Sequence, residues 1–483
     1  MAPDDEHDCA WKHEALSLRG ELGALKQRME QLEASMQRVG KKAVDDKKRQ
    51  ETTPGDKSEK LKSVTTSKPR KPQQGHGPTA QPALPEVDGA VQKLDAADCI
   101  CPDCAGRLEE WPGQFEESEE IDVVVSSYVR KKNRGQKYKC CKCTHIESPL
   151  AAPKVLPGGR YSNEFVLQVV VQKYLDHCPL ERQVRTMSRT GLIVTSQTLW
   201  DQQWALYALL KGLKPRLREY ALRKWVLGVD ETRWPFLGED PRNWTLWCAT
   251  AADVVYIEIL DGRGSEQGQI LLKDFRGILV VDGYAVYEWL SKTYPDITLA
   301  FCWAHVRRHF RDVEKAFPQE VKRLLDLVSQ LFKIDSEATS KDHLLVLRKA
   351  RSQLIVDEIK NFITTTAALP ESGLRKAMEY VAKRWTGLTR FMENADIPLS
   401  NNQTERAQRG PVVGRKSHGG SHSERGTESA ALFYSLFETA KLCRINPEAY
   451  LRLAMNEALA GNPVPLPHEV RHHPDLVMPA NSG

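Results

Sequence analysis

The sequence predicts an α/β fold with a mixed central sheet, and three observations support this prediction. Five β-rich runs lie within one stretch of the chain, at residues 225–230, 243–250, 254–260, 278–282 and 298–302. The second and third runs are only three residues apart, which is typical of a hairpin. Helical patterns separate the third, fourth and fifth runs, as parallel strands require. Three antiparallel strands followed by two helix-linked strands describe a ribonuclease-H-like sheet.

The chain begins with a predicted coiled coil, residues 12–40. Apolar residues recur there with a four-three spacing, at Leu18, Leu22, Leu25, Met29, Leu32, Met36 and Val39. Such a seam gains little stability unless a partner covers it. The alternative is a single amphipathic helix docked on its own chain. Residues 41–97 argue against docking, because their Lys-, Ser-, Pro- and Gly-rich composition predicts a flexible basic linker.

Residues 98–150 predict a zinc ribbon. Two CxxC pairs supply four thiolates for a tetrahedral zinc site, at Cys101, Cys104, Cys140 and Cys143. Buried or redox-active cysteines are the alternative. A basic block beside the second pair is suited to phosphate contact and includes Arg130, Lys131, Lys132 and Arg134. A solvated surface is the plainer interpretation of such a block.

Residues 156–222 predict a helical region. An apolar face runs from Phe165 to Tyr174, and Gly191 with the polar residues 195–198 then breaks and restarts a helix. Helix, short turn and helix are compatible with helix-turn-helix DNA binding. A plain helical connector fits the pattern equally well.

Two aspartates, Asp230 and Asp282, each end an apolar run. A carboxylate at the carboxyl end of a buried strand lies at the edge of the sheet where ligand sites gather. Two such carboxylates side by side repel each other unless a cation lies between them. Their hard oxygen atoms favour Mg²⁺ or Mn²⁺. Either aspartate could instead be an ordinary loop or cap residue.

A third carboxylate, Glu405, opens a predicted helix after Pro398, and Ser400 is the expected cap of that helix. By itself Glu405 could be an ordinary acid on a helix surface. Basic residues suited to DNA phosphates follow it, at Arg406, Arg409, Arg415 and Lys416.

The chain resembles transposases of the insertion-sequence 66 family. Short motifs carry the resemblance, at residues 229–232, 281–284, 302–310, 401–406, 414–416 and 431–442. The resemblance implies a ribonuclease-H-like core in two parts, residues 223–310 and 397–452, with a helical insertion at 311–396 between them and a tail at 453–483. Many relatives have Asp where Ser400 stands and Asn where Ser417 stands.

The resemblance also implies a DDE transposase, in which Asp230, Asp282 and Glu405 are the catalytic acids and hold two Mg²⁺ (or Mn²⁺) ions. Cys302 and His305 have the spacing of metal ligands, but two ligands do not make a metal site. We expect these two residues to support the active site by packing or hydrogen bonding.

The expected activity is metal-dependent cleavage and strand transfer of DNA, with recognition of terminal inverted repeats. Joining two DNA ends implies a homo-oligomer, and the family resemblance suggests accessory transposition proteins. A DNA-binding regulator with an inactive core and a structure-specific nuclease are the alternatives. The chain has no run of about 18 apolar residues and its first residues are acidic, so we expect no membrane segment and a cytoplasmic location.

Overall fold

The computed structural model describes residues 128–134, 137–139, 146–147, 152–238 and 244–478. The predicted coiled coil, the linker and all four predicted zinc-binding cysteines lie outside the described residues. Two short strands, β1 (Tyr138–Lys139) and β2 (Ile146–Glu147), pair antiparallel within residues 128–147.

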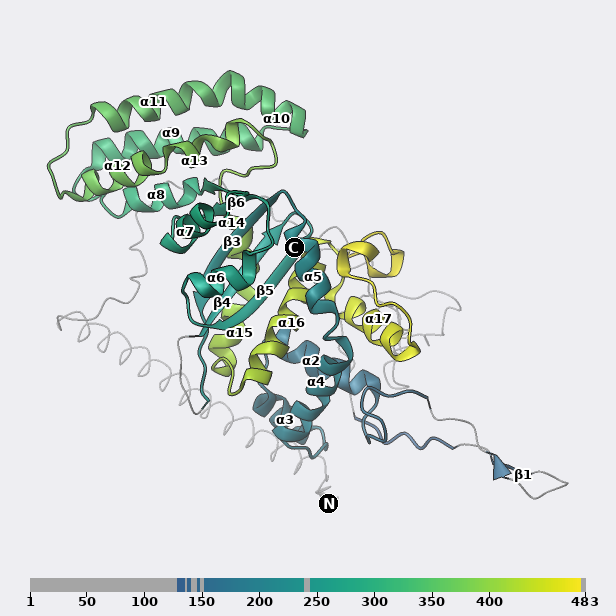
Figure 1. Cartoon of the computed structure of the whole chain (residues 1–483). Helices are drawn as coiled ribbons and strands as arrows, with labels where there is room; N and C mark the ends of the chain where they lie inside the picture. The colour runs from purple at the N-terminus through teal and green to yellow at the C-terminus, as the bar shows by residue number, and fades with distance from the viewer. Residues whose placement is uncertain (1–127, 135–136, 140–145, 148–151, 239–243, 479–483) are drawn as a thin grey trace, which may run out of the picture. The chain divides into compact units, whose positions relative to one another are not determined.

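The centre of the fold is a five-stranded mixed sheet, of which β3, β4, β5 and β6 are labelled in Figure 1. Its strand order is β5-β4-β3-β6-β7. Its strands are β3 (Val226–Arg233), β4 (Trp244–Ala251), β5 (Val254–Asp261), β6 (Gly277–Val281) and β7 (Ile297–Phe301). β3, β4 and β5 are antiparallel, whereas β3, β6 and β7 are parallel. Helices α6 (Ser265–Leu272) and α7 (Ala285–Thr293) make the two crossovers. The predicted α/β class, the hairpin and the mixed sheet are therefore confirmed.

One edge of the sheet, strand β5, is covered by helix α16 (Glu424–Leu442). The hydroxyl of Thr439 accepts the N–H of Val255 at 3.0 Å and donates to its carbonyl at 3.0 Å. The hydroxyl of Ser435 accepts the N–H of Ile257 at 2.8 Å. These bonds satisfy backbone groups that an open edge would leave unpaired.

The predicted helical region contains four helices, α2 (Asn163–Tyr174), α3 (Leu180–Arg189), α4 (Ser196–Leu210) and α5 (Leu213–Leu222). Ser162 caps α2 and Thr195 caps α4 through side-chain oxygens that accept first-turn N–H groups. α4 packs against α2, α3, α16 and α17 (Pro447–Ala460). No helix among the described residues is long and apolar enough to cross a membrane.

After β7 the chain forms a group of helices, seen together in Figure 1. They are α8 (Trp303–Arg311), α9 (Pro318–Ser336), α10 (Lys341–Leu347), α11 (Gln353–Thr365), α12 (Gly373–Lys383) and α13 (Trp385–Thr389). A π-helical turn, η1 (Arg348–Ser352), joins α10 to α11. Its buried Arg348 binds Asp335 and three backbone carbonyls. The chain then returns to the sheet through α14 (Asn402–Ala407) and α15 (Arg409–His418).

Candidate active site

Asp230 and Asp282 occupy matching positions at neighbouring strands: Asp230 lies in β3, and Asp282 directly follows the last residue of β6. β3 and β6 pair in parallel as far as Gly228 and Val280, and each aspartate lies two residues beyond that pair. Because side chains alternate along a strand, the Asp230 carboxylate lies on the same face of β3 as Gly228. Neighbouring strands lie about 4.8 Å apart. The register therefore brings the two predicted acids to the carboxyl ends of neighbouring strands.

The carboxylates in this region are close enough to affect one another's ionisation. Burial, together with the negative charges of Glu231, Asp282 and Glu405, raises the pKa of Asp230 to about 7. The third predicted acid therefore lies within electrostatic reach of the first. Within the described ranges, no three His, Cys, Asp or Glu side chains are grouped closely enough to hold a metal ion as they stand.

The helix that carries Glu405, α14, is fixed to the sheet by the polar residues before that acid. Asn401 donates from its side chain to the carbonyl of Val229 at 2.8 Å. The hydroxyl of Thr404 lies 2.6 Å from that of Thr250 on β4 and donates to the side-chain oxygen of Asn401 at 2.5 Å. Contacts to β3, the strand that carries Asp230, and to the neighbouring strand β4 therefore fix the position of the Glu405 helix.

Ser400 does not cap this helix, so that expectation is wrong. The N-cap residue is Asn401, whose side chain makes no capping bond. Its amide instead contacts β3, and its backbone N–H donates to Cys302 Sγ at 3.2 Å. The helix start is held by contacts to the sheet, which a local capping rule does not anticipate.

The loop that carries Asp282 is held from the other side by Tyr380 of α12 and by Arg384, which follows that helix. The Tyr380 hydroxyl donates to the carbonyl of Asp282, and Arg384 donates to the carbonyl of Gly283 at 3.0 Å. Gly283 has a φ of +100°, and a Cβ there would overlap the Arg384 guanidinium. A residue without a side chain is therefore required at this turn. The Asp282 carboxylate also accepts the N–H of Tyr284 at 2.8 Å.

Cys302 and His305 lie beside the third acid. Cys302 is fully buried, and its sulfur accepts the Asn401 N–H described above. His305 Nε2 lies 3.8 Å from the Glu405 carboxylate. Burial lowers the pKa of His305, while the negative charges of Asp282 and Glu405 act in the opposite direction.

The predicted DNA-contacting residues fall into two groups. Arg406, Arg409 and Lys416 are exposed on α14 and α15, whereas Arg415 is turned inward. The Arg415 guanidinium donates to the hydroxyl of Thr232 at 3.0 Å and to the carbonyl of Arg233. The four basic residues near the second CxxC pair are exposed and lie in a segment without regular secondary structure, at Arg130, Lys131, Lys132 and Arg134.

The comparison with known families decides which family the chain belongs to. Residues 158–429, which include all three predicted acids, match the family model described as Transposase IS66 family. The chain belongs to this transposase family.

The chain is also similar to three proteins of Sinorhizobium fredii (strain NBRC 101917 / NGR234). The chain is 27% identical to the uncharacterized protein y4jD over 411 residues, which cover 78% of each chain. It is 27% identical to the uncharacterized protein y4hP over 385 residues, 73% of this chain and 69% of the relative. A third, the uncharacterized protein y4qI, is 27% identical over 390 residues, 75% of this chain and 71% of the relative.

A fourth carboxylate close to the predicted acids, Glu231, is not among the predicted site residues. Its side chain is 1% exposed and lies 2.7 Å from the Arg263 guanidinium. It also accepts the Tyr287 hydroxyl proton. Glu231 lies on the face of β3 opposite to Asp230, since the two are adjacent on one strand. Burial raises its pKa, and the bonds from Tyr287 and Arg263 oppose that rise. An acid next to Asp230 was the sequence signal for this residue.

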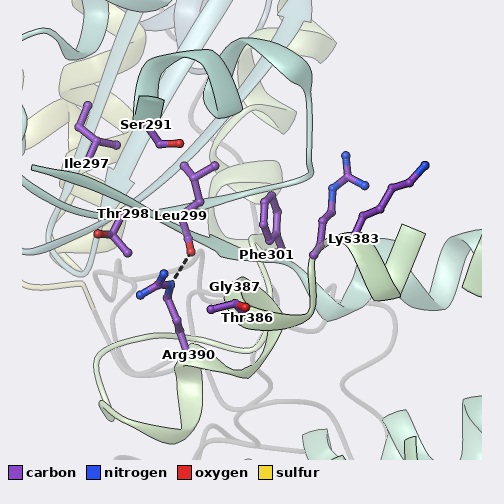
Figure 2. Close-up of a pocket in the computed structure, with 10 residues that line it drawn as sticks. Ser291, Ile297, Thr298, Leu299, Phe301, Lys383, Thr386, Gly387 and Arg390 are labelled. Atoms are coloured by element: carbon purple, nitrogen blue, oxygen red, sulfur yellow. Dashed lines mark hydrogen bonds between the residues drawn. The ribbon is translucent and has the colours of Figure 1, made fainter. Parts of the chain in front are cut away.

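A hollow of about 270 Å³ lies beside strand β7, close to the Asp282 loop. Three basic residues line it, Lys383, Arg384 and Arg390. Figure 2 shows Arg390 directed at Leu299, to whose carbonyl its Nε donates at 2.9 Å. This bond satisfies one backbone group on the second edge of the sheet. Arg384 lines the hollow and also donates a hydrogen bond to the carbonyl of Gly283, the residue that follows Asp282.

Proposed function

We propose that this chain is a DDE transposase with a ribonuclease-H-like core, which cleaves DNA at the ends of an insertion sequence and joins it to a target. Membership of the IS66 transposase family supports this proposal. The strand order, with an antiparallel β3-β4-β5 unit followed by parallel β6 and β7, supports the core assignment. We further propose that residues 311–396 form a helical insertion between the two parts of that core.

The register of β3 and β6 is the observation that carries the proposal. It supports a shared site for the Asp230 and Asp282 carboxylates, and the anchored start of α14 adds Glu405. The donor set suits a hard divalent cation, because all three groups are carboxylates. The raised pKa of Asp230 also fits, since crowded acids require a proton or a cation to offset their repulsion.

In the proposed reaction, Asp230, Asp282 and Glu405 would hold two Mg²⁺ or Mn²⁺ ions. Such ions would supply activation of the attacking oxygen and stabilisation of the leaving oxygen. The chain's own residues provide the positions. Asn401 and Thr404 fix Glu405, and the α12 side chains hold the Asp282 loop. Cleavage by water leaves a 3′-hydroxyl, which then attacks a phosphodiester of the target DNA.

Other parts of the chain would bind the DNA and the second protomer. The zinc ribbon, with Cys101, Cys104, Cys140 and Cys143 as ligands, and the helical region 156–222 would recognise the terminal inverted repeats. The exposed Arg406, Arg409 and Lys416 and the hollow beside β7 would contact phosphates. The heptad seam at 12–40 would pair protomers, and accessory transposition proteins would complete the system.

The test is cleavage of labelled duplex DNA that carries the inverted repeat flanking this gene. With Mg²⁺ or Mn²⁺ the full chain should nick the repeat end. Asp230→Asn, Asp282→Asn and Glu405→Gln should each lower the rate by roughly 10³-fold or more, as expected when one member of a catalytic set is lost. Glu266→Gln, an exposed acid on α6, is the matched control and should cleave normally.

Two results would contradict the proposal. Cleavage at the normal rate by the three variants would remove the acids from the reaction. Binding of the repeat without nicking in either metal would instead identify a DNA-binding regulator.

A further inference from the structure

A second hollow lies between the helical region and the segment that leads into α16. Its volume is about 320 Å³, within the range of roughly 300–1,000 Å³ typical of ligand sites. Lys173 of α2, Gln197 and Trp200 of α4, and His422 and Ser423 before α16 are among the residues that line it. The three proposed catalytic acids, all within the described residues, are not part of its lining.

The side chain of Lys173 is the unusual feature of this hollow. Its ammonium nitrogen lies 5.3 Å from the ring centroids of both Tyr174 and Trp200. It forms no salt bridge with any residue that the structure describes. Burial lowers its pKa to about 8, and the charge of Glu181 only partly offsets this. Glu181 also lines the hollow, but it forms no salt bridge with Lys173. A partly buried cation without a directly bonded carboxylate is costly, and an incoming anion would lower that cost.

An aromatic row on α4 leads away from the hollow. Trp200 stacks on Trp204 with ring centroids 6.0 Å apart, and Trp204 stacks on Tyr207 at 4.6 Å. The Arg425 guanidinium lies 5.3 Å from the Trp204 ring. Trp200 and Trp204 are both partly exposed. Aromatic rings with neighbouring cations are the elements that proteins use to bind unpaired nucleotides, because any base can stack on a ring while a cation holds its phosphate.

We propose that this hollow binds one unpaired nucleotide of single-stranded DNA, with its base stacked on Trp200 and its phosphate at Lys173. Gln197, His422 and Ser423 supply polar groups for the sugar and the base edge. The inference rests on the proposed function in that DNA is the substrate. The proposed nucleotide site is separate from the three catalytic acids. It would hold a DNA strand that has separated from its complementary strand near a cut end.

The first experiment needs no change at the hollow. Full-length Asp230→Asn protein, without added Mg²⁺, is mixed with single-stranded or duplex oligonucleotides that contain one photoreactive thymine analogue. We expect ultraviolet crosslinks to the single strand at Trp200 or His422, mapped by mass spectrometry, and few at these residues with the duplex. Crosslinks that fall only elsewhere in the chain would overturn the proposal.

The second experiment measures affinity against salt concentration. Trp200→Ala should weaken single-strand binding roughly tenfold to 100-fold, and Trp200→Phe should restore most of it, because a ring is still available for stacking. Lys173→Met should lower the slope of log affinity against log salt by about 0.7, the value for one lost phosphate contact on a single strand. Trp225→Ala and Lys349→Met, exposed residues outside the hollow, are the matched controls. Equal affinity and equal slope in all five variants would contradict the proposal.

The two proposals fail in different ways. If the wild-type chain never cleaves DNA but the crosslinks and salt slope are as expected, the catalytic proposal fails and the nucleotide site stands. If the chain cleaves DNA while Lys173→Met and Trp200→Ala bind single strands normally, the nucleotide site fails and the catalytic proposal stands.

Discussion

At Gly228 the lack of a side chain determines how close the helix of Glu405 comes to strand β3. A Cβ at this position would overlap the side-chain oxygens of Thr404 and Asn401. These two residues carry the bonds that fix α14 to the sheet. The absence of a Cβ at Gly228 therefore allows α14, which carries Glu405, to lie close to the strand that carries Asp230.

Gly228→Ala should displace α14 and loosen the site more than it destabilises the fold. We expect DNA cleavage to fall roughly 10–100-fold, as when a group that orients a metal ligand is lost, with a loss of about 1–3 kcal/mol in the free energy of unfolding. Cleavage rates at rising Mg²⁺ concentration and urea denaturation measure the two effects. Gly212→Ala is the control, because nothing lies within 4 Å of its added Cβ. Normal cleavage by Gly228→Ala would contradict this account of the α14 contact.

A second prediction concerns His418 and the dependence of the free energy of unfolding on pH. Burial and the neighbouring Lys173 and His177 lower its pKa to about 4, and Glu181 and the Gly420 carbonyl oppose them. The unfolded chain, with a pKa near 6.5, therefore takes up a proton first as the pH falls. The free energy of unfolding should drop between about pH 6.5 and pH 4 by on the order of 3 kcal/mol from this group.

The comparison with His418→Gln isolates that contribution, because glutamine does not titrate. Urea denaturation from pH 4 to pH 7.5 should give a steeper slope for the wild type than for the variant across this window. Parallel slopes would show that His418 does not cause the effect.

At the scale of the element, α16 is held against β5 by two hydroxyls that replace a missing neighbouring strand. Ser435→Ala and Thr439→Val should each lower the free energy of unfolding by about 1–3 kcal/mol, because each leaves buried backbone groups of β5 unpaired. Thr364→Val, an exposed hydroxyl on α11, should change it by less than about 0.5 kcal/mol. A Thr439→Val protein as stable as the control variant would refute this role.

Elements with a local signal were predictable from the sequence, and those that depend on distant contacts were not. Apolar runs and a three-residue gap predicted all five strands of the sheet, although β3 continues through the polar residues Glu231, Thr232 and Arg233. Asp230 and Asp282 followed from the same runs. Tyr380 and Arg384 did not, because they meet the Asp282 loop from about a hundred residues further along the chain. The anchoring of α14 likewise depends on partners in β3 and β4.

On the scale of the whole molecule, the sheet separates two hydrophobic cores. Leu279 and Val281 of β6 join the core beneath α16 and the helical region. Ile278 and Val280 of the same strand join the core of helices α8 to α13. Burial on both faces explains why this strand is an unbroken apolar run. Asp282 follows directly where the two cores meet, so its loop is held by the sheet on one side and by α12 on the other.

The most direct test of the central claim, that three carboxylates hold divalent cations for DNA cleavage, is a change of metal preference at Asp230. Asp230→Cys replaces a hard oxygen ligand with a softer sulfur, which Mn²⁺ accepts more readily than Mg²⁺. We predict that this variant loses cleavage of the repeat end in Mg²⁺ and recovers it in Mn²⁺, while Asp230→Ser stays inactive in both metals. Equal loss in both metals, or normal cleavage in Mg²⁺, would contradict the assignment of Asp230 as a metal ligand.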